Sequence, residues 1–309
     1  MSTGTAETGG RTGDLTWRTP VVPLPGYPAI FAKLENLQYS GSFKIRGAAR
    51  RLSALTAEER TRGVVACSSG NHGRAVAEAA AHLGIPATVV VPSWADDTKT
   101  DGIRRAGARL VVGGDTYDEA EIRAAGLAEV DGLVPVHPFD DPHVIAGQGT
   151  VAQEVLVQCP DVAEVVVPLS GGGLVGGIAR VLAERSVAVT AVSAERAAVM
   201  HRSVEEGRPV ALEEEPTLAS ALSGGIGLEN EYTFPLVRDL VQRFLLVSEG
   251  QIRSAVSRAA LELKVVVDGG GAVGLAAVWA GYEPKTPCVI IVSGGNIAPD
   301  AWLAAVHED

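Results

Sequence analysis

The stretch that decides the fold is SGSFKIRGAARRL, residues 40–52. It places Lys44 between Phe43 and Ile45 at the start of a helical pattern, in a chain with only five lysines. An amine with apolar neighbours is a candidate for a lowered pKa and for imine formation with a carbonyl group. The simpler alternative is a helix lysine that points at water. The other lysines lie in contexts typical of a surface: Lys33, Lys99, Lys264 and Lys285.

Outward from this stretch the chain alternates strands, glycine turns and helices. Residues 63–92 predict a strand, an alanine-rich helix that stops at Gly84, and a second strand. Residues 162–195 predict another such unit, whose valine-rich strands are typical of a parallel sheet buried on both faces. Residues 288–296, CVIIVSGGN, predict a further buried strand that ends in a glycine turn. This alternation indicates an α/β protein with right-handed crossovers.

The composition is that of a soluble globular protein. The chain has 309 residues, 46% hydrophobic and 20% charged, with a formal net charge of -11. The acidic balance argues against nucleic acid or an anionic membrane as a partner, and no apolar run is long enough to span a bilayer. Residues 1–14 are small and polar, which predicts a disordered tail rather than a signal peptide. Cys67, Cys159 and Cys288 show no zinc spacing and suit a reducing cytoplasm.

A glycine loop, PLSGGGLVGG, follows the strand expected near residue 165. Backbone N–H groups at a helix start bind anions well. One interpretation is a phosphate cup built from five consecutive residues: Ser170, Gly171, Gly172, Gly173 and Leu174. A tight strand–helix turn would look the same. A dinucleotide site is a third interpretation, because Gly171, Gly173 and Gly176 read G-x-G-x-x-G and Glu195 follows at the distance of a ribose-binding carboxylate.

Two other turns end predicted strands. CSSGNHG, residues 67–73, places polar side chains where ligands bind in an open parallel sheet, and Ser69 can exchange a proton. The alternative is an ordinary helix cap beside a structural histidine. In VSGGN, residues 292–296, the hydroxyl of Ser293 can hydrogen-bond a cofactor ring nitrogen, or the turn simply terminates the strand.

Taken together, these signals match the contacts that pyridoxal phosphate requires: an imine lysine, a phosphate cup, an asparagine loop and a serine for the pyridine nitrogen. The chain resembles the fold-type II pyridoxal-phosphate enzymes, specifically the threonine/serine dehydratase and serine racemase family, from about Thr19 through Asn296. Five motifs carry the resemblance in the family's order: SGSFKIRGA, SSGNHG, HPFDDPHVIAGQGT, SGGGLVGG and SGGN. They favour this family over the dinucleotide site.

The resemblance implies an α/β fold of the tryptophan-synthase-β type, with two lobes that each contain a largely parallel twisted sheet flanked by helices. A small lobe, residues 63–141, is expected to interrupt a large cofactor-binding lobe, residues 15–62 plus 142–309. A small amino-acid substrate, a cytoplasmic location and a homodimer are also implied.

By the same resemblance Lys44 forms the imine with the cofactor and acts as the base at the substrate α-carbon, while Phe43 packs near the ring. Asn71 is expected to hydrogen-bond the phenolic oxygen, Ser293 to face the pyridine nitrogen, and residues 170–174 to hold the phosphate. The substrate carboxylate is expected to meet the residues of the asparagine loop: Ser68, Ser69, Asn71 and His72.

The implied reaction is loss of water from a β-hydroxy-α-amino acid, such as threonine, serine, 3-hydroxyaspartate or a larger analogue, to give a 2-oxo acid and ammonia. Ser69 keeps an amino-acid racemase as an alternative, because racemases have a serine at this position that reprotonates the α-carbon. A β-replacement enzyme and a non-catalytic ligand-binding protein on the same fold are further alternatives.

The chain departs from the family pattern at several positions. Racemase-like members often bind a divalent metal, but here Glu195 is followed by His201 where an acid is expected, so no metal is assigned. Asp268 stands where a glutamate is usual. Ser220 and Ala221 replace a frequent Asp-Gly pair, and residues 218–234 look more like the dehydratases of hydroxyectoine breakdown.

We expect Ser69→Ala to remove any racemase activity and to spare dehydration, since the resemblance gives the hydroxyl only the return of a proton to the α-carbon. Chiral analysis of the remaining substrate, run beside a 2-oxo acid assay, measures both activities. Racemisation that continues unchanged in the variant would rule out this role.

Overall fold

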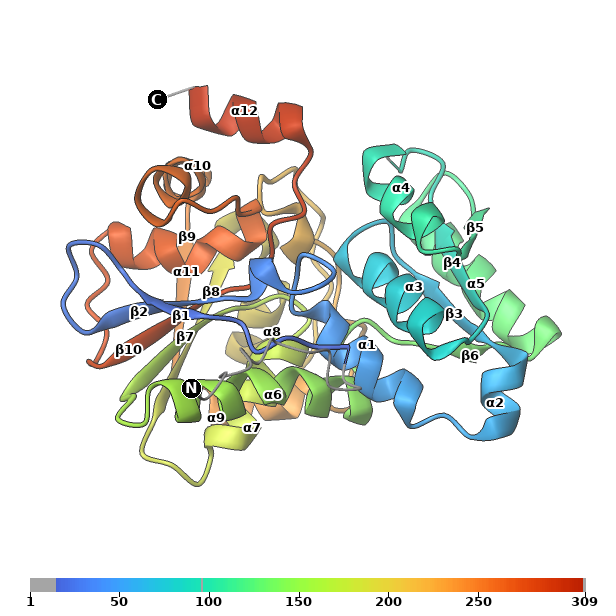
Figure 1. Cartoon of the computed structure of the whole chain (residues 1–309), viewed down its shortest axis with the longest axis horizontal. Coiled ribbons are helices and arrows are strands. Elements are labelled where there is room, and N and C mark those ends of the chain that lie inside the picture. The colour runs from blue at the N-terminus through green and yellow to red at the C-terminus, as the bar shows by residue number, and fades with distance from the viewer. Residues whose placement is uncertain (1–14, 96, 308–309) are drawn as a thin grey trace, which may run out of the picture.

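The computed structural model describes residues 15–95 and 97–307, so the disordered tail predicted at residues 1–14 lies outside the described residues. The chain forms two sheets (Figure 1). The larger has the strand order β1-β2-β10-β7-β8-β9, in which only the β1–β2 pair is antiparallel. Its strands are β1 (Val21–Pro23), β2 (Ile30–Leu34), β7 (Glu164–Pro168), β8 (Ala188–Ala194), β9 (Arg243–Val247) and β10 (Cys288–Val292).

The smaller sheet is parallel throughout, with the strand order β5-β4-β3-β6. Its strands are β3 (Val64–Cys67), β4 (Ala87–Val91), β5 (Arg109–Val112) and β6 (Val134–Pro135). All four fall between β2 and β7 in the chain, so the smaller sheet is built from one continuous stretch that interrupts the larger sheet.

The helices cover both sheets. They are α1 (Lys44–Ser53), α2 (Ala57–Arg62), α3 (Asn71–Leu83), α4 (Asp97–Arg105), α5 (Tyr117–Asp131), α6 (Pro142–Gln158), α7 (Gly173–Leu182), α8 (Val199–Glu206), α9 (Thr233–Leu240), α10 (Glu249–Arg258), α11 (Gly269–Trp279) and α12 (Pro299–His307). Four short turns complete the list: η1 (Glu35–Leu37), η2 (Glu195–Ala197), η3 (Ser220–Leu222) and the π-helical η4 (Ala259–Leu263). None of the helices in the described ranges is both long and apolar enough to cross a membrane.

Both faces of the larger sheet are buried, as the valine-rich strands predict. In β7, Val166 packs with α10 and α11 on one face, while Val165 and Val167 pack with α6 and α7 on the other. Strand β10 alternates in the same way. The predicted strand–helix–strand units are confirmed as β3–α3–β4 and β7–α7–β8, and α3 ends at Gly84 in a left-handed conformation with φ 65°. The expected α/β fold with two largely parallel sheets is therefore correct.

Helix α1 lies between the two lobes (Figure 1). Its apolar residues Ile45, Ala48 and Leu52 join the core of the smaller lobe, and the helix also packs against α6 of the larger lobe. Lys44 is its first residue, which agrees with the helix start expected from the sequence. The helix thus presents Lys44 at the boundary between the lobes.

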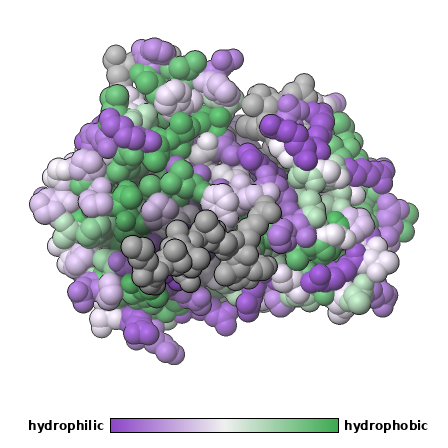
Figure 2. Space-filling model, in the orientation of Figure 1, coloured by the Kyte–Doolittle hydropathy of each residue, from purple (hydrophilic) through white to green (hydrophobic). Residues whose placement is uncertain are grey.

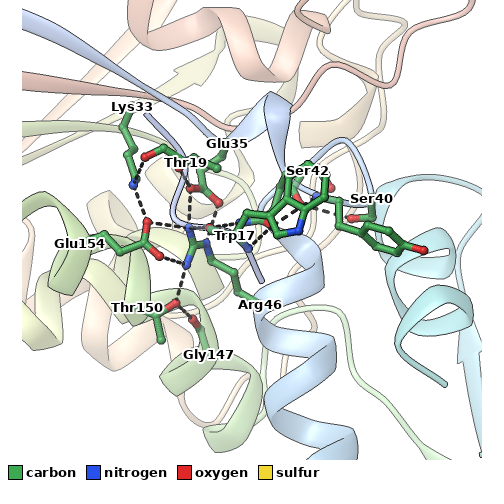
Figure 3. A network of polar contacts seen from close by, with 12 residues as sticks. Trp17, Thr19, Lys33, Glu35, Ser40, Ser42, Arg46, Gly147, Thr150 and Glu154 are labelled. Atoms are coloured by element: carbon green, nitrogen blue, oxygen red, sulfur yellow. Dashed lines mark hydrogen bonds and ion pairs between the residues drawn. The ribbon is translucent and has the colours of Figure 1, made fainter. Parts of the chain in front are cut away.

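A buried ion network anchors α1 (Figure 3). The Arg46 guanidinium donates to both carboxylate oxygens of Glu35, at 2.7 and 2.8 Å, and to both of Glu154, at 2.7 and 3.0 Å. Burial alone would lower the pKa of Arg46, but the two carboxylates outweigh it and raise that pKa. Because Glu35 follows β2 and Glu154 lies on α6, one guanidinium joins three segments of the fold.

Lys33 also belongs to this network, which corrects the expectation that it lies at the surface. Its side chain is fully buried on β2, and its Nζ donates to Glu154, to the Gln158 amide oxygen at 2.8 Å and to the Thr19 carbonyl oxygen at 2.8 Å. Burial lowers the pKa of Lys33, although Glu154 opposes that shift. The residues around Lys33 in the sequence do not reveal its partner, because Glu154 lies 121 residues further along the chain.

We expect Arg46→Met to destabilise the protein by about 3–5 kcal/mol, because it leaves Glu35 buried without its cation. The matched control is Arg202→Met, which removes an exposed arginine that pairs with Glu205 at 3.0 Å and should cost less than about 1 kcal/mol. Denaturant unfolding followed by circular dichroism measures both. Equal losses in the two variants would show that the network adds nothing beyond a surface ion pair.

Candidate active site

The Lys44 amine has a neutral partner. Its Nζ donates to the Pro138 carbonyl oxygen at 2.8 Å and lies 5.3 Å from the centroid of the Phe43 ring. No carboxylate pairs with it in the described part of the chain. Burial therefore lowers the pKa of Lys44 to about 8. An amine with this pKa is partly uncharged near neutral pH, which suits it to act as a nucleophile or base.

Backbone hydrogen bonds hold the segment before Lys44 against the turn after β10. The Phe43 N–H donates to the Ser293 carbonyl oxygen at 3.0 Å, and the Gly295 N–H donates to the Gly41 carbonyl oxygen at 2.9 Å. The Ser293 side chain is buried, and its hydroxyl has no hydrogen-bond partner among the described residues. Two motifs that are about 250 residues apart in the sequence therefore meet, and the Ser293 hydroxyl is left for a ligand.

The glycine loop caps the N-terminus of α7. Gly172 has a φ of 87°, in the left-handed region that favours glycine. The Phe139 ring covers the loop so closely that a Cβ on Gly171 would lie 2.3 Å from it. The unpaired N–H groups of the first helical turn can hold an anion, which fits the predicted phosphate cup.

The motif that supplies Phe139 also binds the start of α9, and α9 in turn contacts the glycine loop. The Asp140 carboxylate accepts hydrogen bonds from the backbone N–H groups of Glu231, Tyr232 and Thr233, at 2.8, 2.9 and 2.8 Å, where α9 begins. The side chain of Thr233 lies against Gly172. Sequence reasoning used HPFDDP only as a family motif and missed both contacts, because neither α9 nor the glycine loop is near it in the chain.

The loop with Ser68 and Ser69 forms the N-terminus of α3. The Ser68 hydroxyl accepts from the Gly70 N–H at 3.2 Å, and Ser69 is half-buried with no partner among residues that the structure describes. The His72 ring is committed elsewhere: its Nε2 donates to the Val136 carbonyl oxygen at 2.8 Å. Burial, and then the charge of Lys44, lower the pKa of His72 to about 3, so the ring is neutral. The His72 ring therefore does not fit the predicted contact with the substrate carboxylate, which could involve the backbone N–H of His72 instead.

Asn71, the first residue of α3, contacts two residues of the larger lobe. Its Oδ1 accepts from Asn296 Nδ2 at 2.6 Å, and its Nδ2 lies 3.4 Å from Asp268 Oδ2. Asp268 is buried and caps α11 through the Gly271 N–H at 2.7 Å. Burial raises the pKa of Asp268, although these hydrogen bonds oppose the shift. Asn296 was not assigned a role from the sequence; its place at the end of the SGGN motif was the available signal.

No metal centre is formed by residues 15–95 and 97–307, where no three His, Cys, Asp or Glu side chains are arranged to hold an ion. His201, which stands where the family pattern has an acid, stacks on Phe244 with ring centroids 5.8 Å apart. The three cysteines are free thiols, and Cys288 is buried in β10.

These features fit pyridoxal phosphate. Lys44 supplies an amine with a lowered pKa, the glycine loop supplies backbone donors at a helix start, and Ser293 supplies a hydroxyl that no described residue engages. They lie at the ends of strands and the starts of helices, where the two lobes meet. Figure 2 shows a notch in the surface between the lobe that carries α4 and the part that carries α12.

A comparison with protein families matches residues 13–294 to the family described as pyridoxal-phosphate dependent enzyme. The chain belongs to this family. Its cofactor is pyridoxal phosphate, and the dinucleotide interpretation of the glycine loop and Glu195 is wrong.

Similarity to individual known proteins identifies a smaller group within this family. The L-threonine ammonia-lyase of Thermotoga maritima is 44% identical over 271 residues, which cover 87% of this chain and 67% of the relative. Maize serine racemase superposes with a TM-score of 0.87 at 34% identity, covering 95% of this chain and 92% of the racemase. The processed threonine deaminase isoform 2 of Solanum lycopersicum gives 0.88 at 32% identity, covering 95% and 83%. The chain is thus a fold-type II enzyme of the threonine/serine dehydratase–serine racemase group.

We expect cofactor-free protein to take up pyridoxal phosphate faster as the pH rises, with a midpoint near 8. Only the uncharged amine attacks an aldehyde, and burial holds the pKa of Lys44 at about 8 instead of 10.5. Stopped-flow absorbance of the bound cofactor measures the rate, with Lys44→Ala as the blank. A rate that still climbs steeply above about pH 9 would contradict the lowered pKa.

Proposed function

We propose that this protein is a pyridoxal-phosphate-dependent threonine ammonia-lyase, which converts L-threonine to 2-oxobutanoate and ammonia. The observation that carries the proposal is the Lys44 amine without a carboxylate partner among the described residues, in a chain 44% identical to an enzyme named L-threonine ammonia-lyase. Its partner Pro138 directly precedes Phe139, the residue that covers the glycine loop. The match covers 87% of this chain.

In this proposal each side chain has a separate task. Lys44 binds the cofactor and, once released as a free amine, removes the substrate α-proton; Phe43 packs beside the ring. Bound pyridoxal phosphate supplies the electron sink that makes the α-proton acidic. Ser293 meets the ring nitrogen with a neutral hydroxyl rather than a carboxylate. A neutral hydroxyl from Ser293 would leave that nitrogen largely unprotonated, which would favour elimination of the β-hydroxyl over transamination.

Two helix starts hold the negative groups. The loop of residues 170–174 before α7 receives the phosphate, and the first turn of α3 receives the substrate carboxylate, together with Ser68, Ser69 and Asn71. Both sites use backbone donors rather than cations, and His72 contributes only its N–H. Asn71 also donates to the phenolic oxygen of the cofactor.

Racemisation is the second candidate, because of Ser69. Its half-buried hydroxyl has no partner among the described residues, and the chain is 34% identical to maize serine racemase over 95% of its length. Ser69 is free to return a proton to the α-carbon on the face opposite Lys44. We infer that slow racemisation accompanies elimination.

We also propose the finer features that the family resemblance implies. Residues 63–141 form a small lobe and residues 15–62 with 142–309 a large one, and the protein is a cytoplasmic homodimer. The substrate range extends toward that of hydroxyectoine-breakdown dehydratases. The position of η3 supports this: a Cβ on Gly270 would lie 3.2 Å from the Ala221 Cβ, so the Ser220–Ala221 replacement lies beside Asp268.

We expect rapid 2-oxo acid release from L-threonine, and complete loss of that activity in Lys44→Ala. The assay panel is L-threonine, L-serine, 3-hydroxyaspartate and larger β-hydroxy amino acids, with chiral analysis of the leftover substrate. Antipode without oxo acid would replace the lyase by a racemase, and product trapped by an added thiol would replace it by a β-replacement enzyme. Full activity of Lys44→Ala would overturn the mechanism.

A further inference from the structure

A chain of polar side chains runs behind Asn71 and joins the two lobes. Arg74 on α3 donates from Nη1 to Asn296 Oδ1 at 2.9 Å, and Asn296 Nδ2 donates to Asn71 Oδ1 at 2.6 Å. Asn71 in turn offers its Nδ2 toward Asp268 at 3.4 Å. Arg74 and Asn71 belong to the smaller lobe, whereas Asn296 and Asp268 follow and precede elements of the larger one.

The orientation of the Asn296 amide is forced by its two partners. Arg74 can only donate, so it takes the amide oxygen, and the Ser40 carbonyl oxygen can only accept, so it takes Nδ2 at 2.8 Å. Gly41 allows the amide to lie there, because a Cβ at that residue would come within 2.4 Å of Asn296 Oδ1. Turning the Asn296 amide over would set nitrogen against guanidinium and oxygen against carbonyl.

The Asn296 amide then dictates the orientation of the Asn71 amide. Since Asn296 presents Nδ2, Asn71 must meet it with Oδ1, and the Asn71 Nδ2 is turned the other way, toward Asp268. An amide nitrogen carries two hydrogens, so one remains for a ligand when the other points to Asp268. The opposite orientation would present an oxygen to that ligand.

We propose that Arg74 and Asn296 are positioning residues that hold the Asn71 amide with its donor toward the phenolic oxygen of the cofactor. The proposal rests on the contact between Asn71 and that oxygen in the proposed function. A donor there stabilises the ionised phenolic oxygen and so holds down the pH at which the bound cofactor loses its proton. Neither Arg74 nor Asn296 is placed against the cofactor itself.

The deciding variant is Asn296→Asp, which keeps the shape and the Arg74 contact, loses the hydrogen bond to the Ser40 carbonyl oxygen, and offers only acceptors. Asn71 must then turn its Nδ2 to the new carboxylate and its oxygen to the cofactor. We expect the pH midpoint of the bound cofactor's absorbance change to rise by about one unit, the size of one hydrogen bond to a charged group. The measurement is a spectral titration of the loaded enzyme without substrate.

The matched control is the same substitution in an Asn71→Ala background. A mere effect of the added charge would shift the midpoint equally with and without Asn71, whereas reorientation of Asn71 requires the shift to vanish in the double variant. Equal shifts in the two backgrounds, or no shift from Asn296→Asp, would overturn the proposal. If Asn71→Ala alone leaves the midpoint unchanged, the contact between Asn71 and the cofactor fails instead.

Arg74 is tested separately. We expect Arg74→Met to raise the midpoint in the same direction, because Asn296 then loses the donor that fixes its oxygen, and Arg74→Lys to stay closer to the parent enzyme. A midpoint that Arg74→Met leaves unchanged would remove Arg74 from the chain of contacts. A drop in thermal stability without any spectral shift would reduce its role to that of a structural residue.

Discussion

The structure around Lys44 depends on how one buried guanidinium is satisfied. Arg46 follows Lys44 by two residues on α1 and binds Glu35 from the end of β2 and Glu154 from α6. A buried charge is tolerated only when it is paired and hydrogen-bonded, so these three segments must come together for the chain to fold. This network (Figure 3) thereby fixes the start of α1, whose first residue is Lys44.

The different partners of Lys33 and Lys44 separate a structural lysine from a reactive one. Both have a pKa lowered by burial. Lys33 has the carboxylate of Glu154 beside it, which favours its charged form, whereas the hydrogen-bond partner of Lys44 within the described ranges is the neutral carbonyl oxygen of Pro138. Burial without a counter-ion is the physical condition for a nucleophilic amine. Lys33 therefore has a structural role, and Lys44 is left available for chemistry.

An acidic protein can still bind anions. The formal net charge is -11, yet the proposed ligands carry a phosphate and a carboxylate. The helix starts at α7 and α3 offer unpaired N–H groups and partial positive charge that come from the backbone itself. Because these donors belong to the backbone, the site needs no surplus of basic residues, and the net charge of the chain does not limit its substrate class.

The sequence by itself determined the local elements and the α/β class, because strand and helix periodicity and glycine turns act over a few residues. The cofactor followed from the motifs taken together and from the family resemblance that they carry. Tertiary structure decided what those motifs meet. The burial of Lys33, the contact of Phe139 with Gly171, and the capping of α9 by Asp140 each join residues far apart in the chain. The His72 ring likewise turned out to bind Val136. Hydrogen bonds and desolvation depend on neighbours in space, and a sequence pattern carries no record of which distant strand will supply them.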